Sequence, residues 1–217
     1  FAAKVKYFFA YGWALPVFYD WAGTTIYVPG TVSVAIPAAH ADLIGVSDGV
    51  HQGRQTMADR VVDTYAFDAG RISYQFLWGH FQTFQQDWEG VDVACVLDES
   101  HAAYGPACVS TVKDVLDFHS GHFSKYPYPR LKVIDAGSIL AGGYGAPMNI
   151  VLHSHVLDSF DYVFAGVVSH EIGHQWWGGI VSFDLAGGIP ATEGLAEFSA
   201  SLYQEQRGIY DHAWGRH

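Results

Sequence analysis

The chain has 217 residues, half of them hydrophobic, so it can bury a substantial core as one large domain or two modest ones. Its formal net charge is −11 with only 11 lysines and arginines, which argues against the basic surface that nucleic-acid binding requires. No run of eighteen or more apolar residues occurs, so no membrane-spanning helix is predicted. Because the chain begins with Phe1 rather than Met, we expect it to be part of a longer protein.

The first third of the chain predicts β-structure. Segments 24–30, 31–37 and 63–70 concentrate β-branched and aromatic residues between Gly, Pro and Asp turn signals. We expect several antiparallel strands joined by polar turns. Residues 71–86 and 91–97 continue the same pattern.

Two cysteines, Cys95 and Cys108, flank a segment with a turn signal. A disulfide closing this loop would fit an extracytoplasmic protein. Two buried free thiols fit the sequence equally well, and both alternatives stay open. Neither cysteine has another potential metal ligand at the spacing found in zinc fingers, so neither is assigned to zinc.

The middle of the chain predicts a helix and two strands. Residues 111–123 carry apolar side chains at helical spacing, and 131–135 supply a short strand. A glycine-rich segment then leads into a further strand, where glycine lets the backbone come close to a ligand. His153 and His155 alternate on that strand, which predicts that they share one face, in a structural or cleft-lining role.

The strongest chemical signal lies in residues 170–193. His170 and His174 are four residues apart, so on a helix they point to one spot, and Glu193 opens a second helical stretch. Two neutral imidazoles and one carboxylate are the usual ligands of a catalytic zinc, which keeps its fourth position for water. We predict one Zn²⁺ held by these three residues. Glu171 cannot easily reach the same ion but can reach the water, which predicts that it is the catalytic base.

Two helices are expected to carry this site. The first is predicted to begin near Asp158 or Ser159, which are good N-caps, and to end at Trp177 or Gly178. It is apolar nearly all round, which predicts that it is buried.

The second helix is expected to have Pro190 in its first turn and Gly208 at its end. Glu197 lies one turn beyond Glu193. A carboxylate there can accept a hydrogen bond from a zinc-binding histidine, and a solvated carboxylate is the alternative.

These residues carry a family resemblance. HEIGHQWWG, followed after eighteen residues by Glu193 within TEGLAEF, resembles the gluzincin metallopeptidases of the aminopeptidase N and leukotriene hydrolase type. Thr192 stands where that family usually has Asn. The resemblance implies an α+β fold with a thermolysin-like zinc metallopeptidase catalytic domain at residues 76–217, incomplete at its C-terminus. It also implies that residues 1–75 are part of a preceding β-rich domain.

The resemblance also implies a substrate-binding loop. The family carries a G-A-M-E-N type loop beside the substrate cleft, and its Glu holds the free amino terminus of the substrate. The corresponding substrate-binding residues here are Gly145, Ala146, Met148 and Asn149, with Met148 in the place of that Glu. A thioether cannot pair with an ammonium. Backbone around Gly145 can still bind an extended peptide by strand addition, and a tight loop without a substrate role is the alternative.

The predicted function is therefore zinc-dependent hydrolysis of peptide bonds, with removal of N-terminal residues. A zinc endopeptidase of other specificity and a non-catalytic homologue within a larger assembly are the alternatives. The expected partner is a peptide or protein substrate. A disulfide between the two cysteines, and the usual location of the family's members, favour an extracytoplasmic location, which is periplasmic, secreted or membrane-associated.

Overall fold

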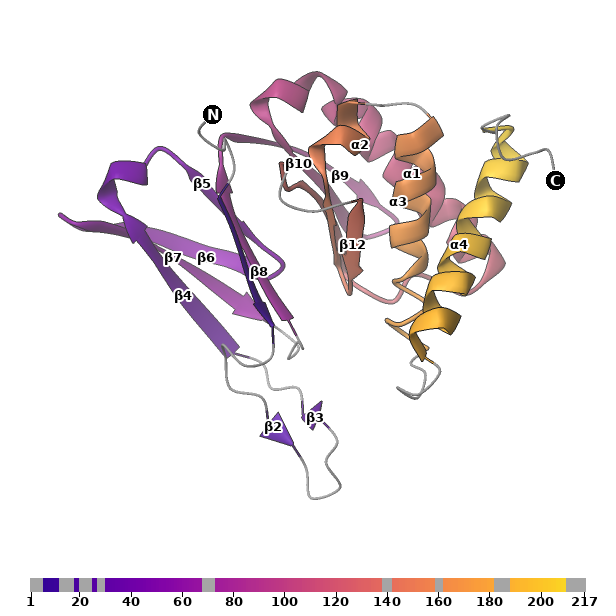
Figure 1. The fold of residues 1–217 in the computed structure, drawn as a ribbon, viewed down its shortest axis with the longest axis horizontal. Helices are drawn as coiled ribbons and strands as arrows, with labels where there is room; N and C mark the ends of the chain where they lie inside the picture. The colour runs from indigo at the N-terminus through magenta and orange to yellow at the C-terminus, as the bar shows by residue number, and fades with distance from the viewer. Residues whose placement is uncertain are drawn as a thin grey trace. The chain divides into compact units, whose positions relative to one another are not determined.

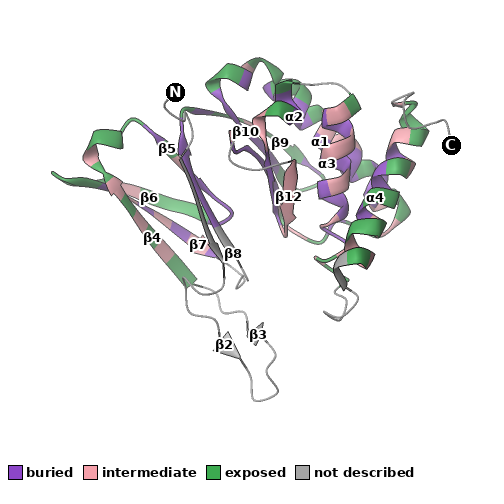
Figure 2. Ribbon diagram, viewed as in Figure 1, coloured by how far each residue is buried: buried purple, intermediate pink, exposed green. Residues whose placement is uncertain are grey.

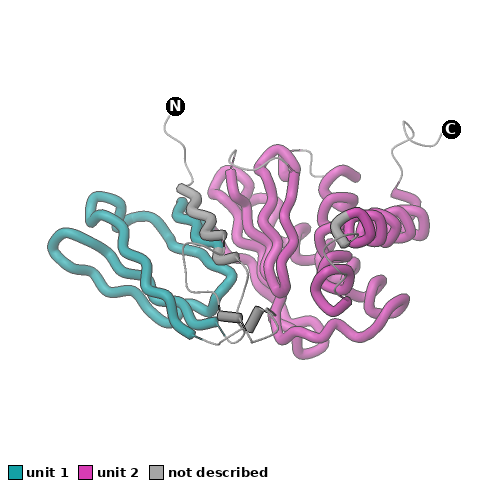
Figure 3. The backbone as a smooth tube through the Cα atoms, turned by 60° about the horizontal axis from the view of Figure 1, so that its bottom comes forward, with its two compact units in different colours: residues 1–81 teal, residues 82–217 magenta. Residues whose placement is uncertain are grey.

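In the computed structural model (Figure 1) the described residues are 6–11, 18–19, 25–26, 30–67, 73–137, 142–158, 162–181 and 188–209. The chain divides into two compact units, Phe1–Phe81 and Gln82–His217, which Figure 3 colours separately. Helices and strands both contribute, which confirms the mixed α+β class. The sequence predicts a domain boundary after residue 75, and the first unit ends at Phe81.

The described part of the first unit is built from β-strands and the short helical turn η1 (Ala38–His40). The strands are β1 (Lys6–Tyr11), β2 (Phe18–Tyr19), β3 (Thr25–Ile26), β4 (Gly30–Pro37), β5 (Ile44–Ser47), β6 (Val50–Thr56), β7 (Arg60–Phe67) and β8 (Ser73–Gly79). They form antiparallel sheets in the orders β1-β8-β5, β4-β7-β6 and β2-β3. Alternate residues of β7 are buried, because neighbours on a strand point to opposite faces. The expectation of antiparallel strands is confirmed for these residues.

The second unit contains a five-stranded sheet in the order β12-β13-β11-β10-β9. Its strands are β9 (Phe81–Trp88), β10 (Val91–Asp98), β11 (Arg130–Asp135), β12 (Gly143–Ala146) and β13 (Asn149–Leu152). The parallel strands β10, β11 and β13 are mostly buried, as expected for strands covered on both faces. β12 is antiparallel to β13 and ends the sheet, so no described strand pairs with its outer edge.

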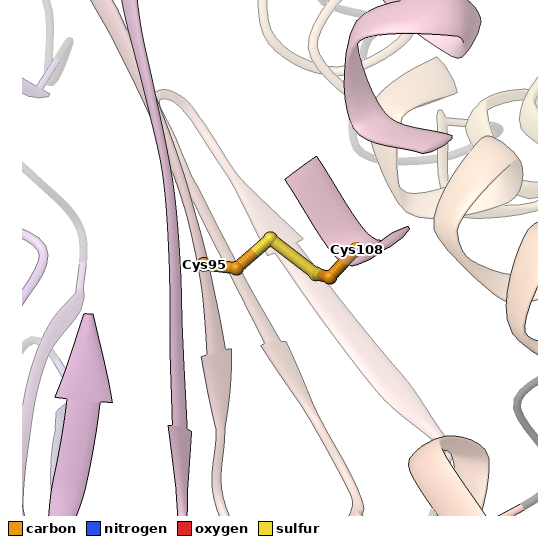
Figure 4. Close-up of a disulfide and its surroundings, with 2 residues drawn as sticks. All are labelled: Cys95 and Cys108. Carbon is orange, nitrogen blue, oxygen red and sulfur yellow. A yellow bond between two sulfur atoms is a disulfide. The ribbon is translucent and has the colours of Figure 1, made fainter. Parts of the chain in front are cut away.

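The helices of the second unit are η2 (Glu99–Tyr104), α1 (Gly105–His122), α2 (Ser154–Asp158), α3 (Tyr162–Gly173) and α4 (Gly188–Arg207). α1 packs against β10 and α3, and buried residues of these elements belong to one hydrophobic core (Figure 2). The Cys95–Cys108 disulfide joins β10 to α1 (Figure 4), so of the two alternatives for the cysteines the disulfide is confirmed.

The histidine-bearing helix differs from its prediction at its end. α3 ends at Gly173, and His174 lies in the turn that follows, not inside the helix. Asp158 is the last residue of the separate helix α2, and the other expected cap, Ser159, lies outside the described residues. The prediction that His153 and His155 share a strand face is wrong, because β13 ends at Leu152 and His155 belongs to α2.

α4 follows its prediction more closely. Pro190 lies in its first turn, and Gly208 follows its last residue with φ 63°, the left-handed conformation typical of a helix C-terminus. Among the described residues, no helix has the length and apolarity needed to cross a membrane.

Candidate metal centre

The three predicted zinc ligands come together at the contact between α3 and α4. His170 lies in the last turn of α3, and the His174 N–H donates to the carbonyl oxygen of His170 at 3.3 Å, so the spacing of a helical turn is kept beyond the helix end. Glu193 lies near the start of α4. A Cβ added at Gly173 would lie only 3.2 Å from the α-carbon of Ala196, so glycine there permits the close approach of the two elements.

The distances among these ligand atoms fit a metal ion. The two imidazole Nε2 atoms are 3.2 Å apart. The Glu193 carboxylate oxygens lie 3.3 Å from His170 Nε2 and 3.4 Å from His174 Nε2. Zinc bonds of 2.0–2.1 Å at tetrahedral angles separate neighbouring ligand atoms by about 3.3 Å. The three side chains are therefore close enough to ligate one ion, since one ligand atom from each lies within 4.8 Å of the other two.

Hydrogen bonds on the far side of each ring orient the two imidazoles. His170 Nδ1 lies 3.0 Å from Glu197 Oε2, and His174 Nδ1 lies 3.2 Å from the carbonyl oxygen of Trp177. Both partners only accept hydrogen bonds, so in the neutral tautomer that carries its proton on Nδ1 each ring can donate to its partner. Each Nε2 then turns a lone pair towards the other ligand atoms. In that tautomer the Nε2 atoms and the Glu193 carboxylate attract a cation into the space between them.

Glu171 lies beside this cluster with its residue only 6% exposed. Burial, reinforced by the nearby Glu193 charge, raises the pKa of the Glu171 carboxyl to about 7, against the opposing effects of His170 and a hydrogen bond from the Gly145 backbone. A carboxyl with this pKa can both take up and release a proton near neutral pH.

Glycines in β12 make room for the Glu171 carboxylate. A Cβ at Gly143 would lie 2.6 Å from Glu171 Oε1, and a Cβ at Gly145 would lie 2.9 Å from Oε2. Any larger residue at either position would displace Glu171 or the strand. β12 and Glu171 therefore depend on one another for their positions.

A cavity of about 200 Å³ opens onto the candidate ligands and Glu171. Its other walls come from β12, from the turn after α3 and from the start of α4. Of the four predicted substrate-binding residues, Gly145 lines this cavity, whereas Ala146, Met148 and Asn149 do not.

The placement of Met148 corrects the sequence-based expectation. The residues paired at the hairpin end are Ala146 and Asn149, so Pro147 and Met148 form a two-residue turn between β12 and β13. Met148 has φ 66° and is 5% exposed, and Asn149 is fully buried. The side chains of Met148 and Asn149 are therefore buried and do not line the cavity.

Sequence reasoning missed two residues of this region. Gly143 faces Glu171, and its alternation with Gly145 on a strand was a usable signal, since residues two apart share a face. Gln175 is fully buried. It follows Glu171 by four residues, and residues with this spacing lie on the same face of a helix.

Comparisons with protein-family models and with curated proteins find no match for this chain. The gluzincin resemblance therefore depends on the motif residues alone, and the geometry of these residues has to support any assignment of function.

Proposed function

We propose that the second unit is the thermolysin-like catalytic domain of a zinc-dependent peptidase similar to the gluzincins. The observation that carries this proposal is the convergence of two imidazole Nε2 atoms and the Glu193 carboxylate, with separations of 3.2–3.4 Å and with both imidazoles oriented by partners that only accept hydrogen bonds. This arrangement suits a divalent metal ion held by all three residues, with Glu197 and the Trp177 carbonyl group orienting the two rings.

Each residue then has a distinct role in hydrolysis. His170, His174 and Glu193 would hold one zinc ion, which when bound lowers the pKa of water and polarises a carbonyl group. Glu171, which lies beside the three proposed ligands, accepts the proton of the attacking water and passes it to the leaving amine. Glu197 and the Trp177 carbonyl keep the two imidazoles in the orientation and tautomer that a metal requires.

An extended peptide is the substrate that the cavity walls fit best. β12 ends the sheet beside the cavity, and a peptide can add to such an edge through its main chain. The gluzincin resemblance favours removal of N-terminal residues. The buried Met148 favours an endopeptidase as the second candidate, since Glu171 and Glu193 are the only carboxylates among the described residues that line the cavity.

Zinc content and peptide cleavage test this proposal together. We expect about one zinc per chain after dialysis. We also expect cleavage of unmodified peptides, lost on treatment with a chelator and restored by added Zn²⁺. Paired free-amine and N-acetylated peptides separate the two candidates, because an aminopeptidase requires the free amine and an endopeptidase cuts both.

Two results would contradict the proposal. A chain that binds no zinc would remove its chemical basis. A chain that binds zinc and cleaves neither set of peptides would instead indicate a non-catalytic homologue within a larger assembly.

A further inference from the structure

Gln175 lies in the turn that follows α3, and its side chain binds the β12–β13 hairpin. Its Nε2 donates to the carbonyl oxygen of Ala146 at 2.8 Å, and its Oε1 accepts from the Met148 N–H at 2.8 Å. Oε1 also accepts a longer bond, at 3.4 Å, from the Tyr126 hydroxyl. Gln175 is fully buried, so water does not compete for these bonds. One amide thus binds both ends of the hairpin turn.

The hairpin turn needs such support. Met148 has φ 66°, a left-handed conformation that is uncommon for a residue other than glycine, asparagine or aspartate. A turn of this kind costs free energy and persists where its surroundings hold it. The bond from the Met148 N–H to Gln175 is a contact of this kind.

Two pairs of residues, each four residues apart, face different parts of this region. His170 and His174, four residues apart, face the candidate metal position. Glu171 and Gln175, also four apart and shifted by one residue, both face the hairpin. Glu171 accepts a hydrogen bond from the Gly145 backbone, and Gln175 binds the next residue, Ala146. The second pair therefore holds β12 against the end of α3 and the turn that follows it, where His170 and His174 lie.

We infer that Gln175 is a positioning residue for peptide hydrolysis, whose amide holds β12 in register with Glu171 and with the candidate metal position. The inference rests on the proposed function, since it assigns β12 as the strand beside which the substrate lies. Gln175 itself touches neither the cavity nor a ligand atom. Its effect on catalysis passes through the hairpin.

The test replaces Gln175 by Met, which has a similar shape and no amide. We expect the Gln175→Met variant to lose kcat/KM by about 10- to 100-fold, since small displacements of reacting groups have effects of this size. Its zinc affinity should stay within about threefold of the wild type, unlike the loss of about 10- to 100-fold expected when a ligand-orienting partner is removed. Gln204→Met is the matched control, because Gln204 is a half-buried glutamine of α4 that does not line the cavity.

Hydrogen exchange supplies a second measurement that needs no activity. The Met148 amide should exchange at least about tenfold faster in Gln175→Met. The Met57 amide, which donates to the Arg60 carbonyl oxygen in the first unit, serves as the internal reference. If Gln175→Met does not fold, Gln175→Asn replaces it, because this variant keeps an amide too short to reach both partners.

Three outcomes would overturn the inference. The first is a kcat/KM within threefold of the wild type, even with lower thermal stability. The second is a parallel fall in zinc affinity, which would mean that Gln175 acts through the metal site. The third is unchanged exchange of the Met148 amide. If the wild type cleaves no peptide, the proposed function fails on its own, and the exchange experiment still decides whether Gln175 holds the hairpin.

Discussion

Replacing Gly145 by Ala tests how closely β12 must approach Glu171. A Cβ at this position would lie 2.8 Å from the Glu171 backbone oxygen, which is 0.6 Å inside the 3.4 Å at which ordinary contact begins. It would also lie 2.9 Å from Glu171 Oε2 and 3.2 Å from His174 Cβ. The closest of these atoms belongs to the backbone and cannot rotate away. The strand must therefore move by roughly half an ångström or distort the end of α3.

Both stability and activity should respond to this displacement. Overpacking of this kind costs about 1–3 kcal/mol in the free energy of unfolding. Displacement of the substrate strand and of Glu171 should lower kcat/KM by about 10- to 100-fold. The backbone of Gly145 is outside the left-handed region, so the expected loss comes from the clash and not from a change in conformational preference.

Urea denaturation and peptide-cleavage kinetics measure the two effects. Gly121→Ala is the matched control, because a Cβ at Gly121 in α1 meets no atom within 4 Å. This control should unfold at the same or a slightly higher urea concentration than the wild type and should cleave peptides at the same rate. A Gly145→Ala variant as stable and as active as Gly121→Ala would refute the reasoning.

Three further predictions concern the metal, the pH and the disulfide. Glu197→Gln should weaken zinc binding by about tenfold in a competition titration, whereas the exposed Glu205→Gln on the same helix should not, and equal affinities would contradict the role of Glu197. Burial lowers the pKa of His119 from 6.5 to about 4, so the unfolded chain takes up the proton first as the pH falls. The free energy of unfolding should therefore drop by about 3 kcal/mol between pH 6.5 and 4, and His119→Gln should lack this drop in urea denaturation at each pH. If the free energy of unfolding changes with pH in the same way in the wild type and in His119→Gln, then His119 is not the cause of the drop. Replacing both Cys95 and Cys108 by Ala removes a cross-link between residues 13 apart and should lower the free energy of unfolding by about 3 kcal/mol, an effect that an unchanged denaturation midpoint would rule out.

The parts of the candidate site that sequence could predict are those fixed by spacing within one element. Residues four apart in HEIGH must share a side of a helical turn, and the three proposed ligands do lie within 3.2–3.4 Å of one another. The core strands β10 and β11 could also be predicted from the sequence, because buried strands appear as nearly continuous runs of apolar residues.

The end of α3 could not be predicted from local signals. Gln175 and the two tryptophans after it carry no helix-stop signal, so the pattern predicts a helix as far as Gly178. In the structure, the Gln175 and Trp176 N–H groups already bond three residues back, to Ile172 and Gly173. Trp176 Nε1 donates to Ser124, which lies far away in sequence. Such tertiary contacts determine where this helix ends and have no local signature.

The interior position of Met148 has a similar origin. The resemblance aligns Met148 with a cleft residue of the gluzincins. This alignment predicts a cleft position only if the loop has the same backbone conformation in both proteins. The conformation of Met148, with φ 66°, depends on the buried amide of Gln175 from another element. Only the assembled structure relates these two residues.

The most direct measurement of the central claim compares the wild type with Glu171→Gln. This substitution keeps the shape of the side chain but removes its ability to accept a proton from water. We expect about one zinc per chain in both proteins, with peptide cleavage slowed by about 10²- to 10⁴-fold in the variant. Cleavage at the wild-type rate by Glu171→Gln, or the absence of zinc from the wild type, would contradict the account.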